Sequence, residues 1–500
     1  MTPPWWGQGL TGTVSWVGLE KHCARSLTDS AQYARSDGTC HDQSLRNQAV
    51  TEVGFPKAIP CLGMGIAESR AGEAKEAILN AAVQELDQEG QGGFRISRVL
   101  ERSNASFSSL YHHFGSRQGL VREAHIERFS ASTRHDLATF AEAALQAQTT
   151  QEFFDLTARQ VFDAANNPSV QRGRHQRIES LAVALTDPEL LELIIPVQRH
   201  HISALAGILE RVQQRGLIRK DLDLESYVVW INGMQLGHVL LEIDRDLGPS
   251  SPTWDRCAIL ATLQPLSVDD EPLAWSPSWE FKRPKNWGQP ILLNYAESPE
   301  ISDHPTAKAL MANAIAILET QGEGAIRLPL VLEGTGTSVT SIYHFFGDRE
   351  GLITAANAER FMRVSPGVVV DYRSATSLAK TSEDFFAFLR LNLSMHALNE
   401  EIVRWRWSRI EVLGAALQRP ALLTAVEKSQ RKIIDQFASI TQDAQDRGFL
   451  RDDIEPKSAS LWFQGMQMGR VLTEIQPGLD QNNEWLTLAV EGIDAALRTR

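Results

Sequence analysis

The sequence lacks a long apolar run and a cysteine framework. No stretch of its 500 residues approaches the roughly 18 consecutive apolar residues that a membrane-spanning helix needs, so we expect no membrane association. Cys23, Cys40 and Cys61 precede the globular part, and only Cys257 lies beyond. This distribution gives neither a disulfide pattern nor a metal-ligand spacing and suits a reducing cytoplasm. The N-terminal stretch has no basic start or sustained apolar segment, so we expect no secretory signal.

The common catalytic signatures are also missing. No glycine-rich phosphate loop, nucleophile elbow or HExxH motif occurs. The adjacent pairs His112-His113 and His200-His201 do not form a metal site, because neighbours on a helix point about 100° apart and no Cys, Asp or Glu completes a ligand set. We therefore predict a protein that is not an enzyme and that uses neither a cofactor nor a metal.

An excess of positive charge is absent too. The formal net charge is −13, which argues against non-specific coating of nucleic acid but allows a locally basic reading surface on an acidic body. A soluble composition, 43% hydrophobic and 22% charged, over this length indicates two or more globular domains.

What the sequence does contain is one phrase in two versions, SSLYHHFGSRQGL at 108–120 and TSIYHFFGDREGL at 340–352. The same offset of 232 residues aligns WINGMQLGHVLLEI (230–243) with WFQGMQMGRVLTEI (462–475). Because the offset stays constant from Gly90 to Ile243, we interpret it as a tandem duplication of a whole domain rather than a short-period solenoid.

The duplication sets the domain boundaries that we predict. Each copy shows helical periodicity, as in Ile78, Ala82 and Leu86, and no hairpin pattern, so the expected fold is all-α. Residues 266–302 hold five prolines and read as an irregular connector. The predicted parts are a disordered extension (1–68), a first helix-turn-helix domain (69–130), a first helical-bundle domain (131–265), the connector, a second helix-turn-helix domain (303–362) and a second helical-bundle domain (363–500). A translation start at Met64 would remove most of the extension.

The repeated phrase lies in a predicted helix-turn-helix. A short amphipathic helix must reverse within a few residues, and Asn104 or Gly336 stands where a left-handed conformation is needed. Ser106 and Ser338 are then expected to cap the second helix. The core-facing residues of this helix are predicted to be Leu110 and Phe114 in the first copy, and Ile342 and Phe346 in the second.

The exposed face of the second helix carries hydroxyls and imidazoles, which suit phosphates and base edges in a major groove. A polar face on a lone helix is usually only solvated, but here the same face recurs twice beside the same turn. The predicted DNA-binding residues are Arg95, Arg98, Ser106, Ser108, Ser109, Tyr111, His112 and Arg117, and in the second copy Arg327, Ser338, Thr340, Ser341, Tyr343, His344 and Arg349.

These segments resemble the N-terminal domain of TetR/AcrR-type transcriptional regulators. The resemblance rests on Ser103–Ser106, Leu110–Phe114 and Arg117, and on their counterparts Thr335–Ser338, Ile342–Phe346 and Arg349. The sequence departs from that family at Phe107 and Val339, where a lysine is usual. The resemblance implies a double-stranded DNA operator, a homodimer, and a small effector bound in the body.

Because one chain holds two heads, we expect an internal pseudo-dimer that acts as a repressor; a higher oligomer stays open. The predicted seam pairs helices around 196–215 and 224–243 with those around 428–447 and 456–475. Gly233 and Gly237, like Gly465 and Gly469, allow close approach of helices. Close packing within one domain is the alternative reading.

The predicted effector-binding residues include two pairs of opposite charge, which could equally be ion pairs that order the bundle. They are Arg177, Glu179, Trp230 and Gln235, with Arg409, Glu411, Trp462 and Gln467. Any two pockets should differ, since Trp405 and Trp407 stand where the first copy has Gly173 and His175.

Two further expectations concern the heads. Residues 95–128 hold six arginines against three glutamates, whereas 327–360 hold three against four acidic residues, which predicts tighter DNA binding by the first head. The alternative function is a duplicated helical binding protein that keeps the fold but acts through protein or small-molecule partners, with weak or no DNA binding.

Overall fold

The computed structural model describes residues 66–268, 271–298, 302–363, 372–374, 376–476, 478–479 and 483–499. The predicted disordered extension lies outside these residues, except that the chain is already helical from Ile66, three residues before the predicted boundary. The described part is all-α, as predicted: its only bridge pairs Leu450 with Arg498, and no strand forms there. None of its helices is long and apolar enough to cross a membrane.

The first helix-turn-helix segment begins with α3 (Ile66–Gly93), which is broken at Gly90, where φ is 65°. It continues through α4 (Ile96–Ser103) and α5 (Phe107–Phe114) into the long α6 (Arg117–Gln146). Ile78, Ala82 and Leu86 are fully buried, which confirms the predicted core face of α3. They join Val99, Leu110 and Phe114 in one apolar cluster beneath the turn.

The second segment repeats this order with α13 (Pro305–Gln321), η4 (Glu323–Ala325), α14 (Leu328–Leu332), α15 (Val339–Phe346) and α16 (Arg349–Met362). Its core cluster includes Leu310, Val331, Ile342 and Phe346. α14 is five residues long and α4 is eight, because the chain leaves the helix before Gly334, whose φ is 72°. Pro329 lies in the first turn of α14, where its missing N–H costs no helical hydrogen bond.

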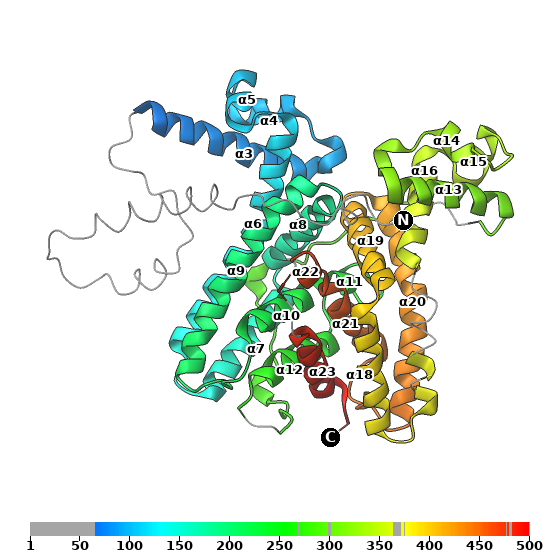
Figure 1. The fold of residues 1–500 in the computed structure, drawn as a ribbon. Helices are drawn as coiled ribbons and strands as arrows, with labels where there is room; N and C mark the ends of the chain where they lie inside the picture. The colour runs from blue at the N-terminus through cyan, green and yellow to red at the C-terminus, as the bar shows by residue number, and fades with distance from the viewer. Residues whose placement is uncertain are drawn as a thin grey trace, which may run out of the picture. The chain divides into compact units, whose positions relative to one another are not determined.

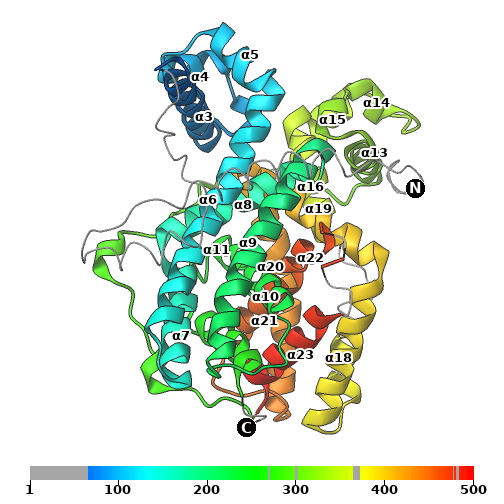
Figure 2. The same cartoon turned by 60° about the vertical axis from the view of Figure 1, so that its left-hand side comes forward.

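The helical bodies follow each segment (Figures 1 and 2). The first contains α6, α7 (Thr150–Asn166), α8 (Pro168–Ala184), α9 (Pro188–Gln214), α10 (Leu224–Gly237), α11 (Val239–Glu242) and α12 (Pro252–Leu263). The second contains α18 (Ser382–Leu398), α19 (Glu400–Leu417), α20 (Pro420–Asp446), α21 (Pro456–Gly469), α22 (Val471–Glu474) and α23 (Glu484–Leu497). Capping boxes begin α7 at Thr149 and α18 at Thr381, so these two helices start by the same chemistry.

The connector contains only the single turns η1 (Gln264–Leu266), η2 (Pro277–Trp279) and η3 (Lys285–Trp287), in agreement with the predicted irregular segment. It is pinned to the first body by Trp279, whose indole N–H donates to Asp155 over 2.7 Å. Further along, the Ala296 N–H donates to the Pro420 carbonyl at the start of α20 over 3.3 Å. The connector therefore runs from one body to the other.

Helices α10 and α21 cross at their glycines, as the two views in Figures 1 and 2 agree. A Cβ added to Gly237 would lie 2.1 Å from the Gly465 carbonyl oxygen, and one added to Gly469 would lie 2.0 Å from that of Gly233. The contact is reciprocal and antiparallel: Gly233 faces Gly469, and Gly237 faces Gly465. Of the two readings of these glycines, close approach of one predicted copy to the other is the one that the structure has.

The predicted partner helices in this seam were partly wrong. α8, not α9, forms the second major contact, and it packs on α19, where a Cβ on Gly414 would lie 2.4 Å from Cβ of Ala182. α9 instead packs mainly on α6 and α10 within the first body, and its Gln198 reaches across to donate to the Leu472 carbonyl over 2.9 Å. The physical reason is size: small residues on α8 and α19 let those helices approach most closely.

Candidate DNA-binding interface

The turn between α4 and α5 has the predicted geometry. Asn104 ends α4 in the left-handed conformation with φ 51°, and its N–H bonds back to carbonyls of that helix. The Ser106 hydroxyl accepts the Ser109 N–H over 3.1 Å and caps α5. Gly115 ends α5 at φ 69°. Leu110 and Phe114 are buried below, so the outer face of α5 is fixed toward solvent.

The turn before α15 differs in one bond. Gly336 adopts the predicted positive φ of 64°, and Ser338 occupies the N-cap position. The Ser338 side chain, however, makes no capping hydrogen bond, so that part of the prediction is wrong. The turn is held instead by the Thr335 hydroxyl, which donates to the Leu332 carbonyl over 2.8 Å. The second recognition helix therefore starts with a weaker cap than the first.

The predicted base-reading side chains share one exposed face in each segment. Tyr111 is 49% exposed and Tyr343 is 55% exposed, although both are large and partly apolar. Their exposed polar neighbours are Ser108, His112, Thr340 and His344, and Ser109 and Ser341 are partly exposed. Sequence reasoning gave no DNA role to Phe107 and Val339, which are 57% and 38% exposed in the first turn of each helix.

Arg117 and Arg349 hold the loop that precedes each helix-turn-helix. Arg117 donates to the Phe94 carbonyl over 3.2 Å and lies over the Phe94 ring, 5.3 Å from its centre. Arg349, 232 residues later, donates to the carbonyls of Ile326 and Glu323 over 3.2 and 3.3 Å. Both side chains are thus positioning groups in the structure, beyond the phosphate contacts that the sequence suggested.

The charge excess of the first segment has a structural origin. Arg98 lies 3.4 Å and Arg102 lies 3.3 Å from the carboxylate of Glu85, which is fully buried on α3. Arg122 pairs with Asp187 over 2.7 Å. All three arginines that the second segment lacks are therefore paired with acidic groups, so their formal charge does not support tighter DNA binding. Of the other predicted arginines, Arg95 is exposed, and Arg327 donates to the Gly324 carbonyl over 2.7 Å.

The sequence signal for Glu85 was available but easy to miss. Glu85 adjoins Leu86 on the apolar face of α3, where an ionisable residue is unexpected. Burial of a carboxylate requires paired charges, and arginines at a spacing of four on α4 supply them.

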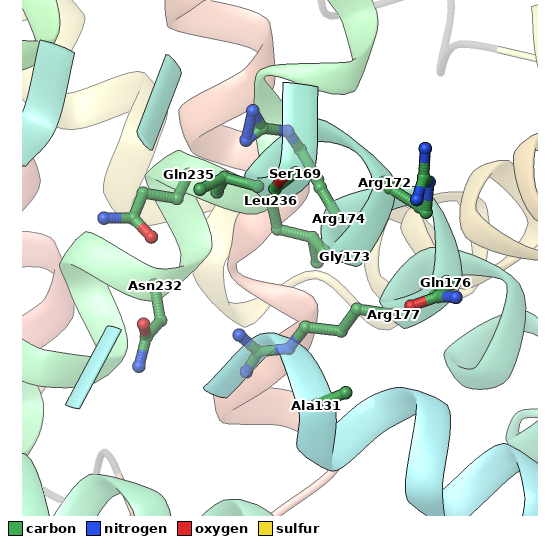
Figure 3. Close-up of a pocket in the computed structure, with 11 residues that line it drawn as sticks. Ala131, Ser169, Arg172, Gly173, Arg174, Gln176, Arg177, Asn232, Gln235 and Leu236 are labelled. Atoms are coloured by element: carbon green, nitrogen blue, oxygen red, sulfur yellow. The ribbon is translucent and has the colours of Figure 1, made fainter. Parts of the chain in front are cut away.

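A cavity of about 240 Å³ opens in the first body (Figure 3). Two of the predicted effector residues, Arg177 and Gln235, line it. The rest of the lining comes from α8, α10 and one residue of α6, and was not predicted. These residues are Ala131, Ser169, Val170, Arg172, Gly173, Arg174, Gln176, Asn232 and Leu236.

The other predicted effector residues have structural roles. Trp230 and Trp462 are fully buried, and Trp230 packs edge-on against Trp485. Glu179 accepts from Arg128 over 2.5 Å and from Gln418 over 2.7 Å, and Arg360 donates to Glu411 over 2.7 Å. Gln467 reaches the Tyr372 hydroxyl over 3.5 Å. The ion-pair reading of the two glutamates is therefore the one that the structure has, with partners other than Arg177 and Arg409.

Arg409 is buried against aromatic rings. Its guanidinium lies 4.1 Å from the centre of the Phe361 ring and 4.9 Å from that of Trp405, and it donates to Gln430 over 2.5 Å. Burial lowers the pKa of Arg409 to about 9.

A second cavity, of about 500 Å³, borders residues on α9, α10 and the loop after α22. Its lining mixes Arg199 with Asp223, Glu225 and Glu484, so it favours no single ligand charge. Within the described residues, no cluster of three or more His, Cys, Asp or Glu side chains is arranged to hold a metal.

Comparison with known proteins identifies the first head. Residues 78–124 match the family model of bacterial regulatory proteins, tetR family. A crystal structure of a TetR-family transcriptional regulator from Mesorhizobium loti aligns with 39% of this chain and 95% of its own, at 18% identity and a TM-score of 0.31. Similarity at that level does not define a fold on its own. No curated protein matches the sequence. The matched segment spans the end of α3, the α4–turn–α5 unit and the start of α6; at residues 78–124 the chain thus carries the N-terminal helix-turn-helix domain of the TetR family.

Proposed function

We propose that this protein is a sequence-specific DNA-binding transcriptional regulator, acting as a repressor, in which two TetR-like units of one chain form an internal pseudo-dimer. The observation that carries the proposal is the crossing of α10 and α21 at two reciprocal glycine pairs. In a two-fold dimer each partner offers the same surface to the other. Here both surfaces come from one chain.

The helix boundaries support the same proposal. α5, α7, α9, α10 and α11 each begin and end 232 residues before α15, α18, α20, α21 and α22. Insertions in loops are well tolerated, so an offset that survives through both helices and loops indicates copies of one unit. The two copies differ most at α4 and α14, the first helices of the two turns.

DNA binding is supported by the exposed faces of α5 and α15. Recognition helices of this type enter the major groove with their N-terminal residues on base edges. Phe107 and Val339 lie at those first positions, where apolar contact with thymine methyl groups is the available readout. We expect Ser108, Tyr111, Thr340 and Tyr343 to supply the hydrogen bonds to phosphates and bases.

Selection of bound DNA from random sequence tests this function. We expect enrichment of one site with two half-sites about one helical turn apart, because two heads read one duplex. Tyr111→Ala and Tyr343→Ala should each weaken binding to the selected site. Leu391→Ala is a matched control, since Leu391 is as exposed as Tyr343 but lies on α18 of the body.

Failure to enrich any sequence would contradict the proposal and favour the duplicated binding protein without DNA affinity. Exposed apolar residues in place of the usual lysine, at Phe107 and Val339, are the observation on that side. A gel shift with the gene's own upstream region gives an independent answer.

A further inference from the structure

The cavity in the first body exists beside a residue with no side chain. Gly173 lies in α8 and lines it. The residue 232 positions later is Trp405, whose ring packs on the Arg409 guanidinium at 4.9 Å. Arg409 is in turn the counterpart of Arg177, another lining residue of the first cavity. An indole thus occupies the side of the arginine that glycine leaves open in the first body.

The lining of the cavity favours a negative ligand. It includes three arginines and no aspartate or glutamate. Arg174 already pairs with Glu242 over 3.2 Å, but Arg177 extends toward Asn232 across the space in Figure 3. The side-chain nitrogen of Asn232 is buried and donates no hydrogen bond within the described residues. Guanidinium and amide donors on one wall are the groups that bind a carboxylate.

The corresponding groups of the second body bond to one another. Arg409 donates to Gln430 over 2.5 Å, and Gln430 donates to Gln464 over 2.9 Å. Gln464 is the counterpart of Asn232. Donors that are satisfied inside the protein lose part of their bonding if a ligand is to bind them, so the second body is closed to the same ligand.

We infer that the first body alone binds one small organic anion per chain, with its carboxylate against Arg177 and Asn232 and its apolar part against Val170 and Leu236. A volume of about 240 Å³ lies below the ~300–1,000 Å³ that drug-sized ligands occupy, which restricts the ligand to a single ring or a short chain.

The regulatory meaning of this site rests on the proposed function. Gln176 lines the cavity and donates to both carboxylate oxygens of Asp87 on α3 over 3.0 Å. Asp87 also accepts from Arg128 over 2.9 Å. A ligand that moves α8 therefore acts directly on the helix that supports the first head.

Calorimetric titration of the full chain with sodium benzoate, and with benzamide as its uncharged analogue, tests the inference. We expect one benzoate per chain and binding of benzamide at least about tenfold weaker, because benzamide lacks the charge that pairs with the guanidinium. Gly173→Trp should abolish benzoate binding by filling the cavity. Gly207→Trp is its control, since Gly207 also lies in a helix and has open space around its Cβ position.

Arg177→Met provides a second variant if Gly173→Trp does not fold. The inference is overturned if benzoate does not bind, if benzamide binds equally well, or if both variants bind benzoate as the unchanged protein does. Titrations without DNA separate this outcome from the proposed function: lost DNA recognition with intact benzoate binding removes only the regulator, and the reverse result removes only the anion site.

Discussion

Glu85 in the first half is buried under Arg98 and Arg102, whereas the same three positions in the second half hold Ile317, Leu330 and Gly334. The bodies differ in the same way. The buried histidines His125, His175, His201 and His238 have the counterparts Asn357, Trp407, Ile433 and Arg470. One backbone plan is therefore stabilised by ionisable clusters in one half and mostly by apolar or permanently charged groups in the other. The comparison teaches that charge counts along the sequence report on core chemistry here, not on DNA affinity.

The largest effect is expected where the halves meet. Gly237→Ala places a Cβ 2.1 Å from the Gly465 carbonyl oxygen, so α10 and α21 must separate. We expect the free energy of unfolding in urea to fall by about 3 kcal/mol, the upper end for overpacked cores. Gly207→Ala, with nothing near its Cβ, should leave stability unchanged or raise it by about 0.5–1 kcal/mol. Equal stabilities of the two variants would contradict a close crossing.

The second effect is a pH dependence confined to the first half. Burial, with Arg128 adding to it, lowers the pKa of His125 to about 3, and burial beside Arg177 lowers the pKa of His201 to about 3. Because these folded-state values lie below the ordinary 6.5, the unfolded chain binds protons first as the pH falls. Stability is complete above pH 6.5 and is lost below it, by about 1.4 kcal/mol per pH unit for each histidine.

Urea unfolding at pH 7.5 and 5.5 measures this loss. His125→Asn, which introduces the residue found at 357, should reduce the difference between the two pH values by about half, while exposed His112→Asn should leave it unchanged. An identical pH dependence in all three proteins would show that these histidines are not the cause.

A third prediction treats the two heads as equals. Arg117→Ala and Arg349→Ala each remove a guanidinium that holds a loop carbonyl, so each should lower stability by about 1–2 kcal/mol. Thermal unfolding compares them with Arg95→Ala, an exposed arginine that should change only DNA affinity and its salt dependence. If Arg117→Ala weakens DNA binding at unchanged stability, the phosphate role suggested by the sequence is the correct one.

The smallest effect distinguishes the two caps. Ser106 accepts the Ser109 N–H, so Ser106→Ala should cost about 1 kcal/mol. Ser338 makes no such bond, and Ser338→Ala should be nearly neutral. Equal costs in urea unfolding would mean that both serines cap their helices in solution.

Much of this architecture was readable from the sequence because it is local or repeated. Turn chemistry at Asn104 and Gly115, and the buried spacing of Leu110 and Phe114, follow from propensity and periodicity. The glycine crossing was predicted only as one of two alternatives, since spacing does not say which helix approaches. The pairing of Arg98 with Glu85 and the closing of the second pocket by Trp405 depend on contacts between distant segments. No local pattern encodes such contacts.

The central claim is that one chain supplies both heads. Light scattering coupled to size-exclusion chromatography, with and without a duplex bearing the selected site, tests it most directly. We predict a free particle of one chain, 55.6 kDa, and a complex of one chain per duplex, because α10 and α21 already cover each other. A two-chain particle that persists on dilution, or two chains on every duplex, would contradict the internal pseudo-dimer.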